Sequence, residues 1–209
     1  MVRLVTQHPP ISGDRYRGIF PIAPTPFTEG GELDLPGQRQ VVDCMIDQEV
    51  DGICILANYS EQFLLTDYER NTLLDVCLVH VADRVPVIVT CSHFSTRIAA
   101  ERAREAEAAG AAMVMMMPPY HGTGLRVDEA AICEHFSEVA ESISIPIMVQ
   151  DAPLSGVTLS VNLLARLATA LPQVAYFKIE VPNTADKLRS LIAIASDVVA
   201  GPFDGEEGI

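Results

Sequence analysis

Lys178 is one of only two lysines in a chain that carries twelve arginines, and it lies within the apolar and aromatic run VAYFKIEVP. A buried ammonium loses hydration that hydrophobic neighbours cannot replace, so it must be paired or it loses its proton. Side chains alternate along a strand, which places Glu180 on the same side as Lys178. The run therefore predicts either a buried ion pair or an amine nucleophile beside a carboxylate.

Other polar residues follow the short apolar runs that we interpret as strands, where the loops of a parallel α/β protein begin. They are Thr25, Asn58, Tyr59, Ser60, Glu61, Ser92, His93, Tyr120, His121, Gln150, Asp151, Glu180 and Asp204. An amine among hydroxyls and amides is what imine chemistry on a small 2-keto acid requires. The amine attacks the carbonyl, and the other groups bind the carboxylate and transfer protons.

Two other kinds of site are not supported by the residue spacing. His93 and His121 lack the carboxylate or cysteine spacing of a metal site, and Ser60 and Ser92 lack the histidine and aspartate partners of a serine hydrolase. The first apolar run is not followed by a glycine-rich phosphate loop. We therefore expect no metal, and a small-molecule 2-keto acid as the substrate. Imine chemistry also requires no cofactor, because the imine itself is the electron sink.

The overall composition indicates one acidic globular domain. The 209 residues are 49% hydrophobic, enough for one substantial core, and the net charge of −14 with a pI near 4.6 argues against nucleic-acid binding. The five cysteines form no CxxC pair, so we expect buried reduced thiols. No apolar run approaches a membrane-spanning length, and we expect a cytoplasmic protein with no membrane contact.

Seven apolar runs recur at intervals of roughly 25 to 35 residues, the length of a βα unit. They are GIFPIAPTPF from Gly18, DGICILA from Asp51, VPVIVTCS from Val85, AAMVMMMPPY from Ala111, IPIMVQDAP from Ile145, VAYFKIE from Val174 and DVVAGPFDG from Asp197. Apolar runs separated by helical stretches predict parallel strands covered on both faces. We predict an α/β fold, a (β/α)8 TIM barrel apparently truncated after the seventh strand, with residues 1–17 as a polar leader and residues 18–209 as the incomplete barrel domain.

The stretches between these runs carry helix start and stop signals. Thr66 followed by Glu69 is a capping-box pattern, and Gly110 is placed to end the helix before it. Asp186 and Lys187 are expected to form a solvated helix start. These signals support the alternation of strand and helix.

Several motifs together resemble the class I, Schiff-base-forming aldolase and lyase superfamily, which includes dihydrodipicolinate synthase and N-acetylneuraminate lyase. The resemblance runs from about Gly18 to the last residue and rests on GIFPIAPTPF, the segment that ends in Glu61, PPY from Pro118, and YFKIE. It implies that Lys178 forms an imine with C2 of a 2-keto acid. It also implies that Tyr120 matches the tyrosine lent across a subunit interface, in a homo-oligomer that is a tetramer.

Two departures from the superfamily pattern narrow the expected reaction. Asn58 and Tyr59 occupy the threonine positions of the usual GTTGE-like loop, and Gln150 replaces the usual tyrosine of the fifth strand. Without that phenol, aldol condensation of the synthase type is disfavoured. The segments ILANYSEQF, MPPYHG, IPIMVQDAP, YFKIE and GPFDGEE resemble the 2-keto-3-deoxy-L-arabonate dehydratase branch, which implies loss of water to give 2,5-dioxopentanoate.

A dehydration through this imine gives the candidate residues their roles. The catalytic candidates are Lys178, Glu180, Gln150 and Tyr120, and the substrate-binding candidates are Asn58, Tyr59, Ser60 and Asp204. Glu180 is the expected proton-transfer group because it lies on the side of the lysine. Gln150 cannot titrate, so we expect it to hold a hydroxyl or a water. Ser60 and the amides around Tyr59 form the candidate carboxylate cradle.

Alternatives remain open on the same scaffold. Deamination of a hydroxylated pyrroline carboxylate, retro-aldol cleavage of a 2-keto-3-deoxy sugar acid, and synthase-like condensation would each use the same lysine. A different class of alternative is an inactive barrel fragment that keeps Lys178 as a buried partner of Glu180 and acts only in binding or assembly. Product analysis separates the enzymatic alternatives, since dehydration releases neither ammonia nor pyruvate.

Overall fold

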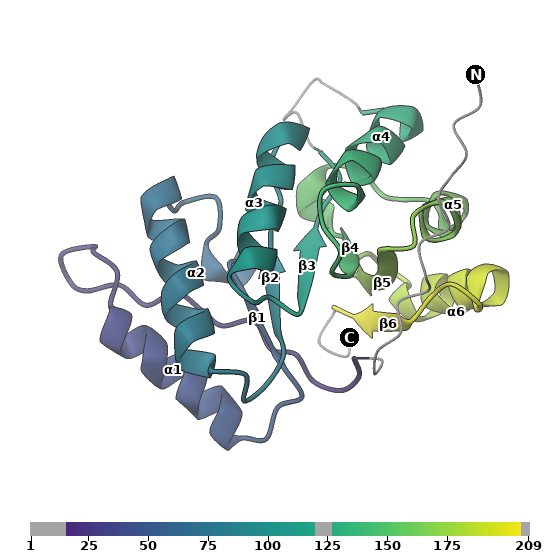
Figure 1. The fold of residues 1–209 in the computed structure, drawn as a ribbon. Helices are drawn as coiled ribbons and strands as arrows, with labels where there is room; N and C mark the ends of the chain where they lie inside the picture. The colour runs from purple at the N-terminus through teal and green to yellow at the C-terminus, as the bar shows by residue number, and fades with distance from the viewer. Residues whose placement is uncertain (1–15, 120–126, 206–209) are drawn as a thin grey trace.

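The computed structural model describes residues 16–119 and 127–205, in which strands and helices alternate (Figure 1). The strands are β1 (Ile53–Ile55), β2 (Val87–Thr90), β3 (Met113–Met116), β4 (Ile147–Asp151), β5 (Val174–Ile179) and β6 (Gly201–Asp204). The α-helices are α1 (Leu35–Asp47), α2 (Asp67–Val81), α3 (Thr96–Ala108), α4 (Glu129–Ala140), α5 (Val161–Ala170) and α6 (Thr184–Ala195). Two short 3-10 helices, η1 (Asn58–Ser60) and η2 (Pro153–Ser155), follow β1 and β4. The predicted alternation is confirmed.

The six strands form one parallel sheet whose spatial order, β1-β2-β3-β4-β5-β6, is the order of the chain. A doubly wound sheet reverses its strand order at a switch point, whereas a (β/α) barrel keeps the chain order and carries its helices on the outside. Figure 1 shows the helices arranged around the strands in that way. The prediction of a TIM-barrel architecture is therefore confirmed for the part of the chain that the structure describes.

The first apolar run differs from the expected strand. It pairs with β1 through one parallel bridge, Ile22 with Cys54, in which Ala23 N donates to Cys54 O at 2.8 Å and Cys54 N donates to Pro21 O at 2.9 Å. The prolines of this run have no N–H to donate, so a longer ladder cannot form. The prediction of seven strands is therefore wrong for the first run, which is not a strand in the described residues. The segment nevertheless lies beside β1 as expected.

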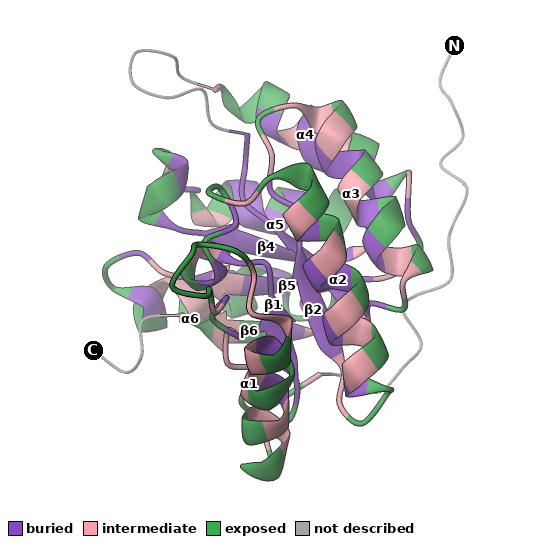
Figure 2. Cartoon of the chain, turned by 90° about the vertical axis from the view of Figure 1, so that its left-hand side faces the viewer, coloured by how far each residue is buried: buried purple, intermediate pink, exposed green. Residues whose placement is uncertain are grey.

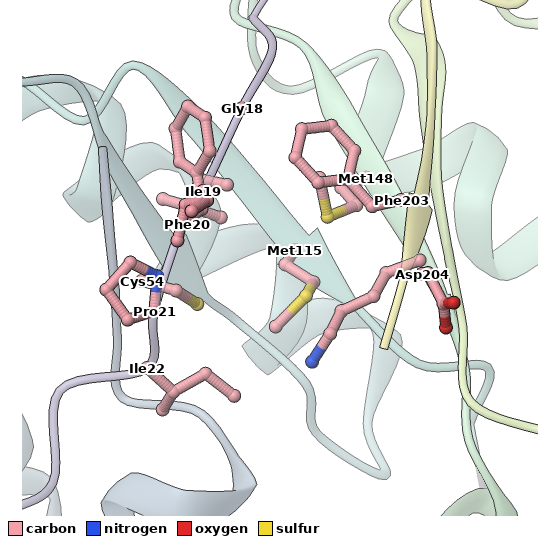
Figure 3. A pocket seen from close by; sticks show the side chains of 12 residues that line it. Gly18, Ile19, Phe20, Pro21, Ile22, Cys54, Met115, Met148, Phe203 and Asp204 are labelled. Atoms are coloured by element: carbon pink, nitrogen blue, oxygen red, sulfur yellow. The ribbon is translucent and has the colours of Figure 1, made fainter. Parts of the chain in front are cut away.

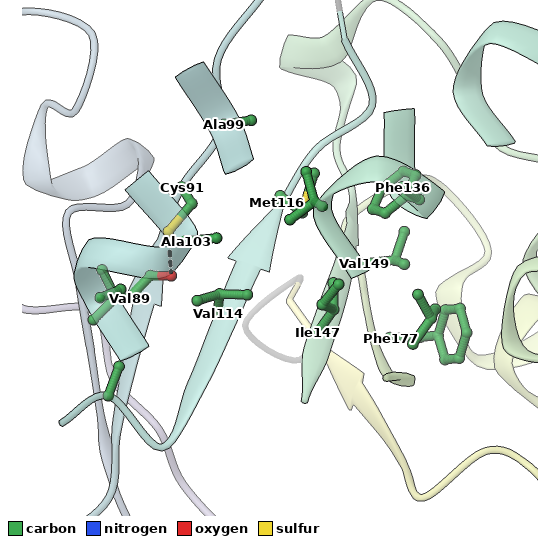
Figure 4. Close-up of a cluster of buried hydrophobic side chains, with 14 of the residues drawn as sticks. Val89, Cys91, Ala99, Ala103, Val114, Met116, Phe136, Ile147, Val149 and Phe177 are labelled. Carbon is green, nitrogen blue, oxygen red and sulfur yellow. Dashed lines mark hydrogen bonds between the residues drawn. The ribbon is translucent and has the colours of Figure 1, made fainter. Parts of the chain in front are cut away.

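Alternating side chains of the strands form two separate hydrophobic layers. The layer on the helix side includes Val89, Val114, Met116, Ile147, Val149 and Phe177, with Ala99, Ala103 and Phe136 from the helices (Figure 4). The layer on the inner side includes Cys54, Ile88, Met113, Met115, Met148 and Tyr176. Strands β1 to β4 are buried and β5 is nearly so, whereas β6 and the outward faces of the helices are partly exposed (Figure 2). A side chain on the inner side of a strand therefore faces the middle of the barrel.

The predicted start and stop signals are present at the helix ends. Thr66 caps α2, since its hydroxyl accepts from Glu69 N at 3.2 Å while the Glu69 carboxylate accepts from Thr66 N at 2.8 Å. Gly110 follows α3 with a φ of +97°, a left-handed conformation that glycine adopts without steric penalty. Both signals are confirmed.

All five cysteines are free thiols. Cys54, Cys77 and Cys91 are buried as expected, whereas Cys44 is exposed and Cys133 is half-buried. The expectation of full burial is wrong for Cys44, which lies on the exposed face of α1, and for Cys133, which is only partly buried where α4 packs against the core. Over the described ranges, no helix has both the length and the apolar character needed to cross a membrane.

Candidate active site

Lys178 and Glu180 are in direct contact at the carboxyl end of β5. The ammonium Nζ pairs with Glu180 Oε1, and each side chain keeps 16% of its surface exposed. The neighbouring residues Phe177 and Ile179 point to the opposite, helix-facing layer. The predicted placement of amine and carboxylate on one side of the strand is confirmed, and the two groups are close enough to exchange a proton.

Gln150 completes this group from the adjacent strand, where it lies in register with Lys178. Its Nε2 donates to Glu180 Oε1 at 3.0 Å and to Oε2 at 3.2 Å. An ionised carboxylate only accepts hydrogen bonds, so the amide nitrogen must face it. The amide oxygen, Oε1, is buried and has no hydrogen-bond partner among the described residues. This oxygen is an unused acceptor next to Glu180, and Gln150 itself does not line the cavity beside Lys178.

Gly205 brings its backbone against the same two side chains. Its N–H donates to Ile179 O at 3.0 Å. A Cβ added at Gly205 would lie 2.4 Å from Glu180 Cγ and 3.0 Å from Lys178 Cε. Only glycine permits this approach without displacing the carboxylate. Sequence reasoning did not identify Gly205, and the glycine that ends the seventh apolar run was the signal that could have found it.

A cavity of about 260 Å³ opens beside Lys178 on the inner side of the strands (Figure 3). It is lined by Gly18, Ile19, Phe20, Pro21, Ile22, Cys54, Ile88, Met115, Met148, Lys178, Phe203 and Asp204. Most of these side chains are apolar, and the two charged ones are Lys178 and the predicted substrate-binding residue Asp204. A small apolar cavity with a few polar groups is typical of small-molecule sites.

Asn58, Tyr59 and Ser60 form the 3-10 helix η1 after β1, and the side chains of Asn58 and Ser60 bond to the protein itself. The Ser60 hydroxyl donates to Ala23 O at 2.6 Å, and Asn58 Oδ1 accepts from Gln62 Nε2 at 2.7 Å. Tyr59 is 69% exposed. These three residues are not part of the described lining of the cavity beside Lys178. Their roles in substrate binding remain predictions.

The strand-end candidates Thr25 and Ser92 bond to the main chain. Thr25 Oγ1 donates to Ser60 O at 2.8 Å, and Ser92 Oγ accepts from Met117 N at 3.0 Å. These bonds shape the ends of the first strands. The predicted catalytic residue Tyr120 lies outside the described residues, and its role stays a prediction.

The second lysine differs from the expectation of a solvated helix start. Lys187 Nζ, which is in the first turn of α6, pairs with Asp151 Oδ2, and the Asp151 side chain is fully buried. Asp186 is exposed and pairs with Arg189 on the surface, as expected of a helix start. The expectation is wrong for Lys187 because the helix packs its first turn against the end of β4, a contact between residues 36 positions apart.

Two other titratable groups, Cys54 in β1 and the strand-end candidate His93, have shifted pKa values. Burial raises the pKa of the Cys54 thiol to about 11. Burial, and after it the charge of Arg102, lowers the pKa of His93, whose Nδ1 accepts from Ser95 N at 2.9 Å. At neutral pH the thiol is therefore protonated and the imidazole is uncharged. Cys54 lines the cavity as a neutral group, and Lys178 is part of the same lining.

Comparison with known proteins shows which family and which relatives this chain is similar to. Residues 15–204 match the family described as the dihydrodipicolinate synthetase family. The L-2-keto-3-deoxyarabonate dehydratase of Azospirillum brasilense is 58% identical over 198 residues, which cover 95% of this chain and 64% of that relative. A 4-hydroxy-tetrahydrodipicolinate synthase of Bartonella henselae is 34% identical over 129 residues, which cover 62% of this chain and 43% of that relative.

A similar fold is found among solved structures. YagE of Escherichia coli K12, a prophage protein of the dihydrodipicolinic acid synthase family in complex with pyruvate, superposes with a TM-score of 0.81 at 30% identity. The match covers 89% of this chain and 63% of YagE. The chain therefore spans less than two thirds of the length of each of these relatives.

Proposed function

This chain belongs to the dihydrodipicolinate synthetase family, and from that premise we propose that its protein dehydrates 2-keto-3-deoxy-L-arabonate to 2,5-dioxopentanoate through an imine on Lys178. The observation that carries the proposal is the contact of Lys178 with Glu180, which Gln150 also binds, beside a small cavity. An amine and a proton-transfer group in contact are what an imine-based elimination needs. The 58% identity to the Azospirillum dehydratase supports the choice of substrate.

The first steps of the proposed reaction use Lys178 and Glu180. The uncharged amine attacks the C2 carbonyl of the keto acid and water leaves, which forms the imine. The protonated imine withdraws electrons from C3 and makes its protons acidic. Because Glu180 contacts the lysine nitrogen, its carboxylate lies near the carbons next to C2 and takes one C3 proton. The enamine that results holds the electron pair needed for elimination.

The later steps expel water and restore the lysine. The enamine releases the C4 hydroxyl as water once that group receives a proton, which Glu180 now carries. A proton shift from C5 to C3 leaves an enol at C4 and C5, which gains a proton at C4 and loses the proton of its C5 hydroxyl to become the aldehyde. Hydrolysis of the imine then gives 2,5-dioxopentanoate and free Lys178. One water is lost overall and no group is oxidised by an external acceptor, so the imine is the only electron sink that the reaction requires.

Gln150 orients this chemistry without transferring a proton. Its Nε2 fixes both oxygens of Glu180, and its buried Oε1 is left to accept a hydrogen bond from the substrate. A hydroxyl of the sugar acid is the donor that fits this acceptor. A keto acid that has no such hydroxyl would leave a buried acceptor unpaired, at a cost in binding.

Product analysis tests the proposed reaction. We expect the protein to convert 2-keto-3-deoxy-L-arabonate into an aldehyde one water lighter, detected by mass after derivatisation, with no pyruvate and no ammonia. Release of pyruvate would instead indicate retro-aldol cleavage, and an amino product or ammonia from a hydroxylated pyrroline carboxylate would indicate deamination. Either result would contradict the proposed dehydration while leaving the family assignment intact.

We also propose that the protein acts as a homo-oligomer. Tyr59, Leu64 and Tyr68 are large side chains that are 69%, 76% and 81% exposed within one short stretch, and exposed apolar surface of this kind is typical of subunit contacts. Light scattering of the purified protein tests this proposal. A monomer at micromolar concentration would contradict it.

A further inference from the structure

We propose that Asp151 and Lys187 form a positioning pair that holds Glu180 and Gln150 in the arrangement that dehydration needs. The inference rests on the proposed function, and it assigns a role to two residues that do not face the cavity. Asp151 directly follows Gln150 in β4, and strand alternation turns its side chain away from the inner layer. Lys187 reaches it from α6 on the other side of the sheet.

Each of the three oxygen atoms of Asp151 has a partner in another part of the chain. Its Oδ1 accepts from Leu159 N at 3.0 Å, its Oδ2 pairs with Lys187, and its backbone oxygen accepts from Glu180 N at 2.9 Å. The side chain is fully buried, so no water competes for these bonds. One residue therefore joins the end of β4, the chain before α5, and the backbone of the proposed catalytic carboxylate.

The loop between Glu180 and α6 is short, and hydrogen bonds hold it in place. Thr184 Oγ1 donates to Val181 O at 2.7 Å, and Lys187 N donates to Asn183 O at 3.1 Å. Asn183 has a φ of +64°, a left-handed conformation that is unfavourable for most residues with a side chain. A shift of the first turn of α6 would thus move the loop that begins at Glu180.

The chemistry of the pair suits positioning better than stability. Two buried charges lose their hydration, and apolar residues of similar volume stabilise such a position equally well or better. An ion pair adds directional bonds that fix where its atoms lie. Here the fixed atoms include the backbone that carries Glu180 and the residue next to Gln150. Small displacements of reacting groups reduce turnover strongly, even when the substrate still binds.

The test compares turnover with imine formation in four variants of the protein. Asp151→Asn keeps the acceptor for Leu159 N but loses the charge, Lys187→Met loses the cation, and Lys187→Arg keeps it. Arg166→Met is the matched control, since Arg166 forms an exposed interhelical ion pair with Glu129. For each variant we would measure kcat for the keto acid per folded protein, the KM, and the yield of borohydride-trapped pyruvate on Lys178.

We expect Asp151→Asn and Lys187→Met to lower kcat about tenfold to hundredfold, while KM and pyruvate trapping stay within about twofold of wild type. Lys187→Arg should restore kcat to within about threefold, and Arg166→Met should change neither value. Unchanged kcat per folded protein in the first two variants would overturn the positioning role. Equal losses of kcat and trapping that follow the folded fraction would also overturn it, because they indicate a purely structural pair. A wild-type protein that traps no pyruvate and dehydrates no keto acid would contradict the proposed function itself.

Discussion

The two lysines of this chain each pair with a carboxylate, and the two pairs lie on opposite sides of the β4–β5 ladder. Lys178 and Glu180 are on the inner side, next to the cavity, with 16% of each side chain exposed. Lys187 and Asp151 are on the helix side, where the aspartate is fully buried. The residue types are nearly the same, so the surroundings must decide what each pair does.

The surroundings differ in what remains for a ligand. Both carboxylate oxygens of Asp151 already have partners, Leu159 N and Lys187, so neither is left for a ligand. Beside Glu180, by contrast, an amide oxygen of Gln150 is buried without a partner among the described residues, and the cavity adjoins the amine. A buried charge pair therefore indicates a reactive site only where space and unused polar atoms accompany it.

Replacing Lys178 should cause the largest loss of activity, because only the inner pair is proposed to react with the substrate. We expect Lys178→Arg to lower kcat/KM for the keto acid at least about a thousandfold, because a guanidinium cannot form the imine although it keeps the charge beside Glu180. Lys187→Arg, the same substitution on the other side of the ladder, should leave most activity. Comparable losses in both variants, measured in one assay, would show that the inner pair has no special chemical role.

Removing the carboxylate should separate imine formation from elimination. Glu180→Gln is nearly isosteric, and we expect it to lower kcat about a hundredfold to ten-thousandfold because the proton-transfer group is lost. Pyruvate should still be trapped on Lys178, since the amine remains. Single-turnover trapping measures imine formation and steady-state kinetics measure kcat, both on the same preparation. Wild-type kcat in Glu180→Gln would assign proton transfer to another group.

A smaller loss is expected where only the position of the carboxylate changes. Gly205→Ala places a methyl group 2.4 Å from Glu180 Cγ, so the side chain must move. We expect kcat to fall about tenfold, with retained pyruvate trapping. Gly201→Ala is the control, because the nearest atoms that its methyl group would meet belong to Tyr176, at 3.0 Å, and to Phe203, at 3.5 Å. A larger kinetic loss in the control than in Gly205→Ala would count against the proposed geometry.

A change remote from both pairs should alter stability alone. Thr66→Ala removes the capping box of α2, and we expect the free energy of unfolding to fall by about 1 kcal/mol. For a chain of this size that corresponds to a drop in Tm of about 2–4 °C. Thermal unfolding by circular dichroism measures the change, and kcat should be unaffected. A clear fall in kcat would mean that the site responds to any loss of stability, which would weaken the comparison.

The sequence predicted those features that depend on local pattern. Strand alternation placed Lys178 and Glu180 together, and the capping box and Gly110 marked helix ends, because each follows from backbone geometry over a few residues. The burial of Lys187 was not predictable in this way, since it depends on how α6 packs against a strand 36 residues away. The close approach of Gly205 likewise depends on tertiary contact, and its effect appears only once Glu180 is located.

The most direct test of the central claim is borohydride reduction of the protein incubated with pyruvate, followed by peptide mass mapping. The chain contains only two lysines, so the map distinguishes the two pairs without ambiguity. We expect the reduced adduct on Lys178, none on Lys187, and loss of the lysine adduct in Lys178→Arg. A folded protein with no adduct on Lys178, or with equal labelling of both lysines, would contradict the assignment of the inner pair as the reactive one.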